Sequence, residues 1–269
     1  DIRISLLKPG EQRPYVRYRK GDRRTDSQSA AGLVLQPGQD LDLVAPAGND
    51  QKLVLDAGFG GATTGDDWVI AQDDQGRVTL TNTATGQLVT ADGYEEIDID
   101  FGPGEDTIEL RDLSNTDLSN DTLTLRTGDG DDTVTAGEDV NRDVEIYGGA
   151  GDDDLQGSNG ADLIDGGTGD DTLSGGVGVD DLDGGEGSDD YVWAAGDGVD
   201  NYSDSGAEGT DTIVVQAETF NGLGDGFSAA GTGIEAIGRD ADGDGSVDTG
   251  SPLLIALSDS GETVDFSGL

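Results

Sequence analysis

The sequence predicts an all-β protein in which a parallel β-solenoid follows a β-rich domain. The first observation is a run of nine-residue units from Gly148 to Val192, where glycine-rich turns alternate with short apolar segments. The second is a series of short apolar segments before this run, separated by Gly, Asn and Asp as strands are separated by turns. The third is that no segment with the apolar period of a helix stands out in residues 33–101.

The run contains five units laid end to end without insertion: GGAGDDDLQ, GSNGADLID, GGTGDDTLS, GGVGVDDLD and GGEGSDDYV. Each unit has a glycine-rich turn ending in Asp, and a larger apolar or aromatic residue two positions later. The Asp residues are Asp153, Asp162, Asp171, Asp180 and Asp189, and the apolar residues are Leu155, Ile164, Leu173, Leu182 and Tyr191. A nine-residue turn and strand make half of a coil, so we expect alternate turns on opposite edges and the apolar residues inside.

Charge restricts the kinds of partner. The chain has 58 acidic and 14 basic residues, a formal net charge of -44. Self-repulsion of this size opposes a compact state, so the chain is either disordered or neutralised by bound cations. The strict repeat favours cations, because disorder requires no fixed spacing. Nucleic acid carries charge of the same sign and is not expected as a partner, and no apolar run is long enough to span a membrane.

Calcium is the cation that the repeat favours. It takes about six to eight oxygen ligands from carboxylates and backbone carbonyls, and glycines allow several carbonyls to approach one point. We expect about three ions in the regular array, between turns of neighbouring coils, at the Asp pairs 153/171, 171/189 and 162/180. The turns of Asp132 and Asp200 are candidates to complete half-sites at the ends of the array. The predicted ligand-forming residues are Gly148, Gly149, Gly151, Asp153, Gly157, Gly160, Asp162, Gly166, Gly167, Gly169, Asp171, Gly175, Gly176, Gly178, Asp180, Gly184, Gly185, Gly187 and Asp189.

Calcium is expected to act as a folding switch. Each unit offers one large apolar side chain, whose burial contributes roughly 1.5–3 kcal/mol, whereas ordering the backbone costs roughly 1–2 kcal/mol per residue. An apolar core alone therefore does not fold the array. The alternative is a metal-free solenoid in which Asp serves only as a turn former, but turn formation does not require a five-fold period.

The N-terminal residues 1–30 are interpreted as a basic arm, since residues 1–24 hold eight of the 14 basic residues. Alternating apolar residues predict a strand at Ile2–Leu6, and 15–19 is a second candidate. One interpretation is an edge hairpin whose bases pair with the chain's own acidic surface. The other is an arm that docks on a second copy by strand addition and charge complementarity.

Residues 31–100 are predicted to be a β-rich domain, and either a small sandwich or the first coils of the solenoid fits the pattern. The expected strands are Leu33–Leu35, Leu41–Val44, Leu53–Leu55, Trp68–Ile70, Val78–Leu80, Leu88–Thr90 and Ile97–Phe101.

Residues 101–147 are predicted to form irregular solenoid coils leading into the regular array. The segments Gly102–Ile108 and Gly128–Val134 repeat the turn pattern loosely, with Asp106 and Asp132 at the Asp position. The expected strands are Ile108–Leu110, Leu123–Leu125, one around Val134, and Val144–Tyr147. Three arginines in this part either lie near one column of the solenoid or neutralise adjacent acids; they are Arg111, Arg126 and Arg142.

The solenoid array is assigned to residues 148–205 and a C-terminal β cap to residues 206–269, with strands at Asp211–Val215 and Leu253–Leu257. Within the cap, Asp240–Asp248 reads D-x-D-x-D-G-x-x-D, the front half of an EF-hand-type loop whose twelfth position is Ser251 instead of an acid. We expect one further calcium ion there. Its predicted ligands are Asp240, Asp242, Asp244 and Asp248.

The array resembles the RTX, or haemolysin-type calcium-binding, proteins. The match is tight from Gly148 to Val192 and looser from Gly102 onward. The resemblance implies a calcium-bound parallel β-roll, export by a type I secretion apparatus that reads a C-terminal signal, and folding outside the cell or at the cell surface. The second unit departs from the pattern at Ser158 and Asn159, so its site is expected to be weaker, although Asp162 is in place.

The residue inventory limits enzymatic functions. Without His or Cys there is no Ser-His-Asp triad, no HExxH zinc site and no thiol nucleophile. Chemistry by paired carboxylates, or a calcium-dependent polysaccharide lyase or epimerase on a β-helix, remains as an alternative. The expected function is non-enzymatic: calcium-dependent folding and self-assembly of a homo-oligomer through the basic arm, as a filament, surface layer, matrix or adhesin. A further alternative is the C-terminal secretion region of a larger exoprotein, a toxin or a hydrolase, because the chain begins with Asp1.

Overall fold

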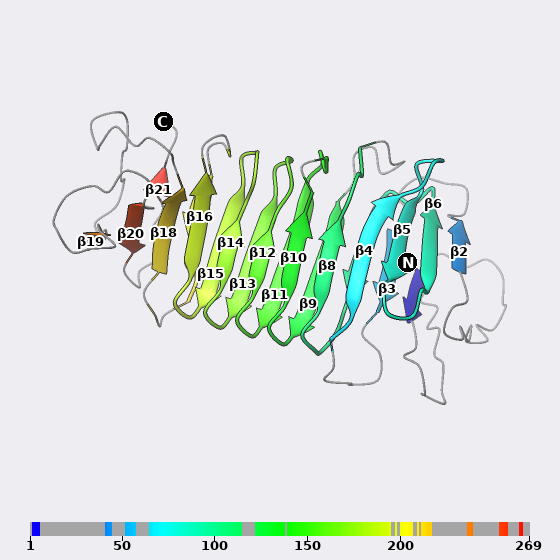
Figure 1. Ribbon diagram of the computed structural model, residues 1–269, viewed down its shortest axis with the longest axis horizontal. Helices are drawn as coiled ribbons and strands as arrows, with labels where there is room; N and C mark the ends of the chain where they lie inside the picture. Colours follow the sequence, from blue (N-terminus) through cyan, green and yellow to red (C-terminus); the bar gives the residue numbers. More distant parts are fainter. Residues whose placement is uncertain are drawn as a thin grey trace, which may run out of the picture.

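Two long β-sheets face each other along an elongated solenoid (Figure 1). The computed structural model describes residues 2–5, 41–44, 52–57, 65–114, 122–137, 139–194, 197, 200–206, 209, 211–216, 236–238, 253–257 and 264–265. All regular structure in these residues is strand. No helix long and apolar enough to cross a membrane occurs among them.

Sheet A contains nine strands. In spatial order they are β1 (Ile2–Ser5), β3 (Lys52–Asp56), β7 (Glu96–Asp100), β9 (Leu123–Asp129), β11 (Val144–Ala150), β13 (Leu163–Thr168), β15 (Asp181–Glu186), β17 (Asn201–Ser203) and β21 (Val264–Asp265).

Sheet B contains twelve strands. In spatial order they are β19 (Ala236–Gly238), β20 (Leu253–Leu257), β18 (Asp211–Gln216), β16 (Asp190–Ala194), β14 (Thr172–Ser174), β12 (Asp154–Gln156), β10 (Thr133–Ala136), β8 (Thr107–Leu110), β4 (Asp67–Gln72), β5 (Val78–Asn82), β6 (Leu88–Asp92) and β2 (Leu41–Val44).

The chain winds by alternating between the two sheets. From β9 to β18 each strand of sheet A is followed by one of sheet B, and every strand pairs in parallel with the next strand of its own sheet. In the regular array Asp154 pairs with Thr172 and Leu163 pairs with Asp181, a register of 18 residues on both sheets. The predicted parallel solenoid with alternate turns on opposite edges is confirmed.

The same winding continues into the N-terminal part. β3 and β7 pair in parallel with each other and lead to β9, and β4 pairs in parallel with β8. Of the two interpretations of residues 31–100, the described strands therefore match the solenoid, with one addition: β4, β5 and β6 form an antiparallel meander within sheet B. β1 pairs in parallel with β3 of its own chain. The strands expected at 15–19 and 33–35 lie outside the described residues.

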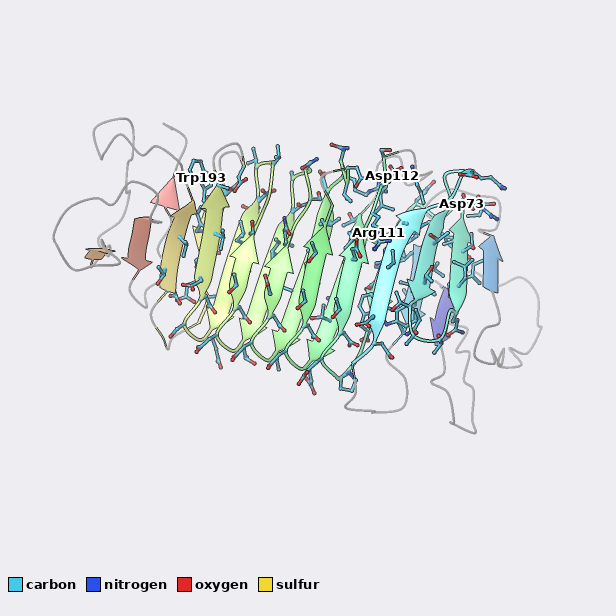
Figure 2. The ribbon with its side chains drawn as sticks, viewed as in Figure 1. Asp73, Arg111, Asp112 and Trp193 are labelled. Atoms are coloured by element: carbon cyan, nitrogen blue, oxygen red, sulfur yellow. The ribbon has the colours of Figure 1, made fainter. Side chains whose placement is uncertain are left out.

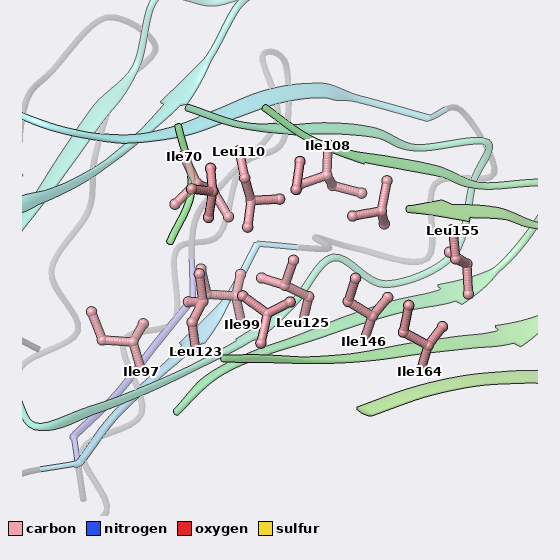
Figure 3. Packing of buried hydrophobic residues seen from close by; sticks show 14 of the residues in the cluster. Ile70, Ile97, Ile99, Ile108, Leu110, Leu123, Leu125, Ile146, Leu155 and Ile164 are labelled. Carbon is pink, nitrogen blue, oxygen red and sulfur yellow. The ribbon is translucent and has the colours of Figure 1, made fainter. Parts of the chain in front are cut away.

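The core differs between the two halves of the solenoid. The strands from β3 to β11 bury two apolar side chains each, such as Ile97 and Ile99 of β7 or Leu123 and Leu125 of β9 (Figure 3). The strands from β12 to β15 bury one each, such as Leu173 of β14. Each additional buried aliphatic side chain contributes roughly 1.5–3 kcal/mol, so the N-terminal coils have the larger apolar contribution to folding.

After the array, strand pairing in the described residues changes from parallel to antiparallel. β18 continues sheet B in parallel with β16, whereas β20 and β21 pair antiparallel with β18 and β17. The strands expected at 211–215 and 253–257 are confirmed, but β17 was not predicted. The candidate loop Asp240–Asp248 lies outside the described residues.

This division of the core predicts where folding requires calcium. In calcium, backbone amides of both 123–136 and 163–174 should be protected from hydrogen exchange. When calcium is removed, 163–174 should lose protection while 123–136 keeps most of it, because the N-terminal coils bury twice as many apolar residues per strand. Hydrogen–deuterium exchange of the whole chain with mass spectrometry would measure both segments in one sample. Equal loss of protection in both would contradict the prediction.

Candidate calcium sites

A column of Asp side chains runs along one edge of the solenoid. This first edge, at the bottom of Figure 1, consists of the turns that lead from sheet A to sheet B, including Gly148–Asp153, Gly166–Asp171 and Gly184–Asp189. The backbone N–H of Asp153 donates to Asp171 Oδ1 at 2.8 Å, and that of Asp171 donates to Asp189 Oδ1 at 2.9 Å. Each carboxylate is therefore tied to the equivalent Asp one coil earlier, which places the predicted pairs 153/171 and 171/189 together.

The column extends in both directions beyond the array. Asp106 N–H donates to Asp132 Oδ1 at 2.7 Å, and Asp132 N–H donates to Asp153 Oδ1 at 2.8 Å. At the other end, Asp189 N–H donates to Asp211 Oδ1 at 3.0 Å. Sequence reasoning missed Asp211 as a member of the column. Its signal is weak: Gly206, Gly209 and Asp211 keep only the first, fourth and sixth positions of the repeat.

The opposite, second edge carries a shorter column. It includes the turns Gly157–Asp162 and Gly175–Asp180. Asp162 N–H donates to Asp180 Oδ1 at 2.8 Å, and Asp180 N–H donates to Asp200 Oδ1 at 3.2 Å. The column begins at Asp162, because Val144 occupies the equivalent position one coil earlier and donates its N–H to Asp162 Oδ1.

The second carboxylate oxygen has no hydrogen-bonding partner in most of the array Asp residues that the structure describes. Within the described part of the chain, Oδ2 is buried and accepts no hydrogen bond in four array residues: Asp153, Asp171, Asp180 and Asp189. These four residues are at most 2% exposed. A buried anionic oxygen without a hydrogen bond is strongly unfavourable unless a cation neutralises it.

Backbone carbonyl oxygens of the next coil lie near Oδ2 of Asp153 and of Asp171. A Cβ added to Gly148 would collide with Asp153 Oδ2 and lie 2.5 Å from the carbonyl oxygen of Gly166, one coil later. Gly166 repeats this relation with Asp171 Oδ2 and the carbonyl of Gly184. A carboxylate oxygen and a carbonyl oxygen of the next coil thus face each other above a glycine. This is the hard oxygen set that calcium takes, so the residues fit the ion.

The backbone conformation explains why glycine occupies the second position of these turns. Gly149, Gly167 and Gly185 have φ values of 114°, 111° and 98°. Residues with a Cβ rarely adopt such values. No group of three or more acidic side chains that could hold a metal is found in the described residues, so each candidate site must combine Asp with carbonyls.

Burial raises the pKa of the column carboxylates. Desolvation raises the pKa of Asp153 and of Asp189 to about 7, and that of Asp162 and of Asp171 to about 6. For Asp180 the pKa is also raised by burial, with a further contribution from the neighbouring Asp162 and Asp200 carboxylates. Without a cation, these groups therefore hold protons at pH values well above those at which an ordinary Asp is ionised.

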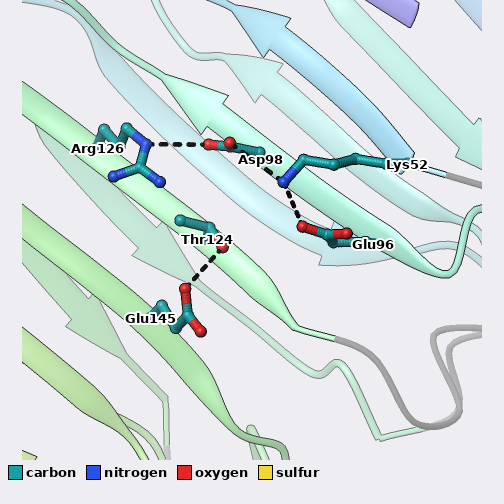
Figure 4. Close-up of polar contacts among 6 residues, drawn as sticks. All are labelled: Lys52, Glu96, Asp98, Thr124, Arg126 and Glu145. Carbon is teal, nitrogen blue, oxygen red and sulfur yellow. Dashed lines mark hydrogen bonds and ion pairs between the residues drawn. The ribbon is translucent and has the colours of Figure 1, made fainter. Parts of the chain in front are cut away.

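The outer face of sheet A carries a separate row of charges, away from the Asp columns (Figure 4). Lys52 pairs with Glu96 and lies 3.5 Å from Asp98, and Arg126 lies 3.3 Å from the same Asp98. The Arg126 guanidinium also stacks over the Tyr147 ring, 4.5 Å from its centre.

The three arginines singled out in the sequence do not form a column. The neighbours of Arg126 in register are Asp100 and Tyr147. Arg111 instead follows β8 and pairs with Glu109, beside Asp112 at the upper edge of Figure 2. The interpretation that Arg111 and Arg126 neutralise nearby acids matches these contacts.

Comparison with known families supports the assignment of the repeats. Residues 124–142, 143–164 and 156–191 match the family model described as the RTX calcium-binding nonapeptide repeat (4 copies). The chain therefore carries RTX calcium-binding repeats over residues 124–191, and the matched region begins earlier than the tight array at Gly148. A search of curated proteins and a search of solved structures found no match.

The pKa shifts predict how the metal-free array responds to pH. An unfolded Asp titrates near 3.8, whereas folded Asp153 and Asp189 titrate at about 7. Between these values the folded state binds protons that the unfolded state releases, so folding is favoured at acidic pH and loses this contribution progressively as pH rises from about 4 to about 7. In calcium-free buffer, strand content by circular dichroism should be higher at pH 5 than at pH 8. Saturating calcium should remove most of the difference, and a metal-free signal that increased with pH would contradict the assignment.

Proposed function

We propose that this protein is an extracellular calcium-binding RTX protein, exported by type I secretion, whose repeat array folds when calcium binds along the Asp columns. The observation that carries the proposal is the buried, unpartnered Oδ2 atom repeated at Asp153, Asp171, Asp180 and Asp189. When bound, calcium supplies the positive charge that these oxygens require. The chain's own residues prepare the sites: backbone N–H groups fix each Oδ1, and glycines let the carbonyls approach.

Asp171 is the best position for a test, since it lies between two candidate sites on the first edge. In a calcium titration followed by far-UV circular dichroism, Asp171→Asn should raise the midpoint concentration by about tenfold or more, equivalent to about 1.4 kcal/mol per tenfold. The matched control is Asp170→Asn. Asp170 is the exposed neighbour of Asp171, and its Oδ1 accepts the Ser188 N–H, a bond that Asn can keep. Equal midpoints for the two variants would refute the proposed sites.

For the task of the folded protein, we propose a non-enzymatic role in self-assembly. Support comes from the uneven charge, because residues 1–24 are basic while the remaining chain is strongly acidic. A basic segment of one copy and the acidic body of the next can form a heterologous contact, which propagates into a filament or layer. The absence of His and Cys from the sequence is the reason for preferring a non-enzymatic role.

Light scattering with and without calcium tests the assembly. Because Ile2–Ser5 belong to sheet A, the arm is better tested by charge removal than by deletion. Replacing Arg13, Arg17, Arg19, Arg23 and Arg24 with Gln should abolish calcium-dependent growth in particle mass while leaving calcium-dependent folding intact. If the chain is instead the C-terminal secretion region of a larger exoprotein, both proteins should stay monomeric at every calcium concentration.

A further inference from the structure

Asp162 is the exception among the array carboxylates, because its second oxygen has a protein partner. Ser158 N–H donates to Asp162 Oδ2 at 2.5 Å. The other oxygen, Oδ1, accepts the Val144 N–H at 2.8 Å. Both oxygens are therefore hydrogen-bonded, whereas Oδ2 of the four sister residues accepts no hydrogen bond within the described part of the chain.

The difference follows from the residue at the second position of the turn. In the sister turns this position is a glycine with positive φ, namely Gly149, Gly167, Gly176 or Gly185. Ser158 does not have a positive φ, as expected for a residue with a Cβ. The backbone of this turn consequently takes a different path and directs the Ser158 N–H toward Asp162.

This path also changes the ligands that the turn can offer. In a planar trans peptide the C=O and N–H groups point in opposite directions. With the Ser158 N–H aimed at Asp162 Oδ2, the Gly157 carbonyl of the same peptide points away from that oxygen. The Gly175 carbonyl and Asp162 Oδ2 still face each other above Gly157, as the equivalent oxygens do above Gly148. The difference is the Ser158 N–H, a hydrogen-bond donor beside Asp162 Oδ2 where calcium would require an oxygen ligand.

The Ser158 side chain holds this arrangement in place. Ser158 is 3% exposed, and its hydroxyl faces the Arg142 carbonyl of the preceding coil at 2.6 Å. The same oxygen accepts the Gly160 N–H at 2.9 Å. The turn is thereby tied to itself and to the preceding coil by hydrogen bonds alone.

We propose that Ser158 takes the place of a calcium ion at Asp162, so that the turn Gly157–Asp162 forms without calcium. Calcium binding on the second edge then begins at Asp180, while the first edge binds ions on both sides of Asp171. The inference rests on the proposed calcium binding of the array and revises the expected site between Asp162 and Asp180. It makes this turn a calcium-independent junction between the N-terminal coils and the calcium-dependent ones.

Calcium stoichiometry of the full chain, by equilibrium dialysis and metal analysis, tests the inference. Ser158→Gly restores the repeat pattern and should bind one more ion per chain than the wild type. Ser158→Ala keeps the Cβ that disfavours the positive φ of the sister turns and should leave the number unchanged. Asp162→Asn should lose no ion, whereas Asp171→Asn should lose at least one.

The outcomes separate this inference from the proposed function. If Ser158→Gly gains no ion, or if Asp162→Asn loses as many ions as Asp171→Asn, the replacement of calcium by Ser158 is wrong while calcium binding by the array stands. If the wild-type chain binds no calcium at all, the proposed function fails and the inference fails with it.

Discussion

The rest of this fold depends on one electrostatic constraint: a row of carboxylates is buried in the turns of the solenoid. Backbone N–H groups satisfy one oxygen of each Asp, as between Asp153 and Asp171, and thereby fix the spacing of the coils. The other oxygen is left facing carbonyls of the next coil. While the carboxylates are ionised, hydrogen bonding alone cannot complete this arrangement because both converging groups are acceptors, so the arrangement requires either protonation or a cation.

The solenoid uses the same winding with two sources of stability. In the N-terminal coils, pairs such as Ile97 and Ile99 fill the interior, and on the second edge the buried Leu113 and Val140 lie in the connecting segments. In the array, one apolar residue per strand remains, and glycine and Asp occupy the turns. The change occurs without interruption of either sheet. A continuous backbone scaffold can therefore include a part governed by apolar burial and a part governed by ion binding.

The array was predictable because its period is short and its residue types are chemically constrained. Five repeats are sufficient to predict the coil, the alternation of edges and the inward-facing Leu155 and Leu173, all of which the structure has. The antiparallel meander of β4, β5 and β6 was not predictable, since alternating apolar patterns do not specify which strands pair. Asp211 escaped notice because hydrogen bonding between coils, and only weakly its own sequence, places it in the column. At Ser158 the sequence predicts a weaker site, but the hydrogen bond from its N–H to Asp162 depends on the direction of one peptide plane, which a sequence pattern does not encode.

The folding of such an array depends on the calcium concentration and the pH around it. Where calcium is scarce, the buried carboxylates oppose the array and only their protonation reduces the repulsion. In the proposed calcium-bound state, the same carboxylates act as ligands, and the repulsion that opposes folding is replaced by attraction to shared ions. At neutral pH the high acidic content of the array is thus compatible with a compact structure only when cations are bound. For the proposed secreted protein this coupling would be a physical advantage, because the array would remain unfolded during export and become ordered when it reaches calcium.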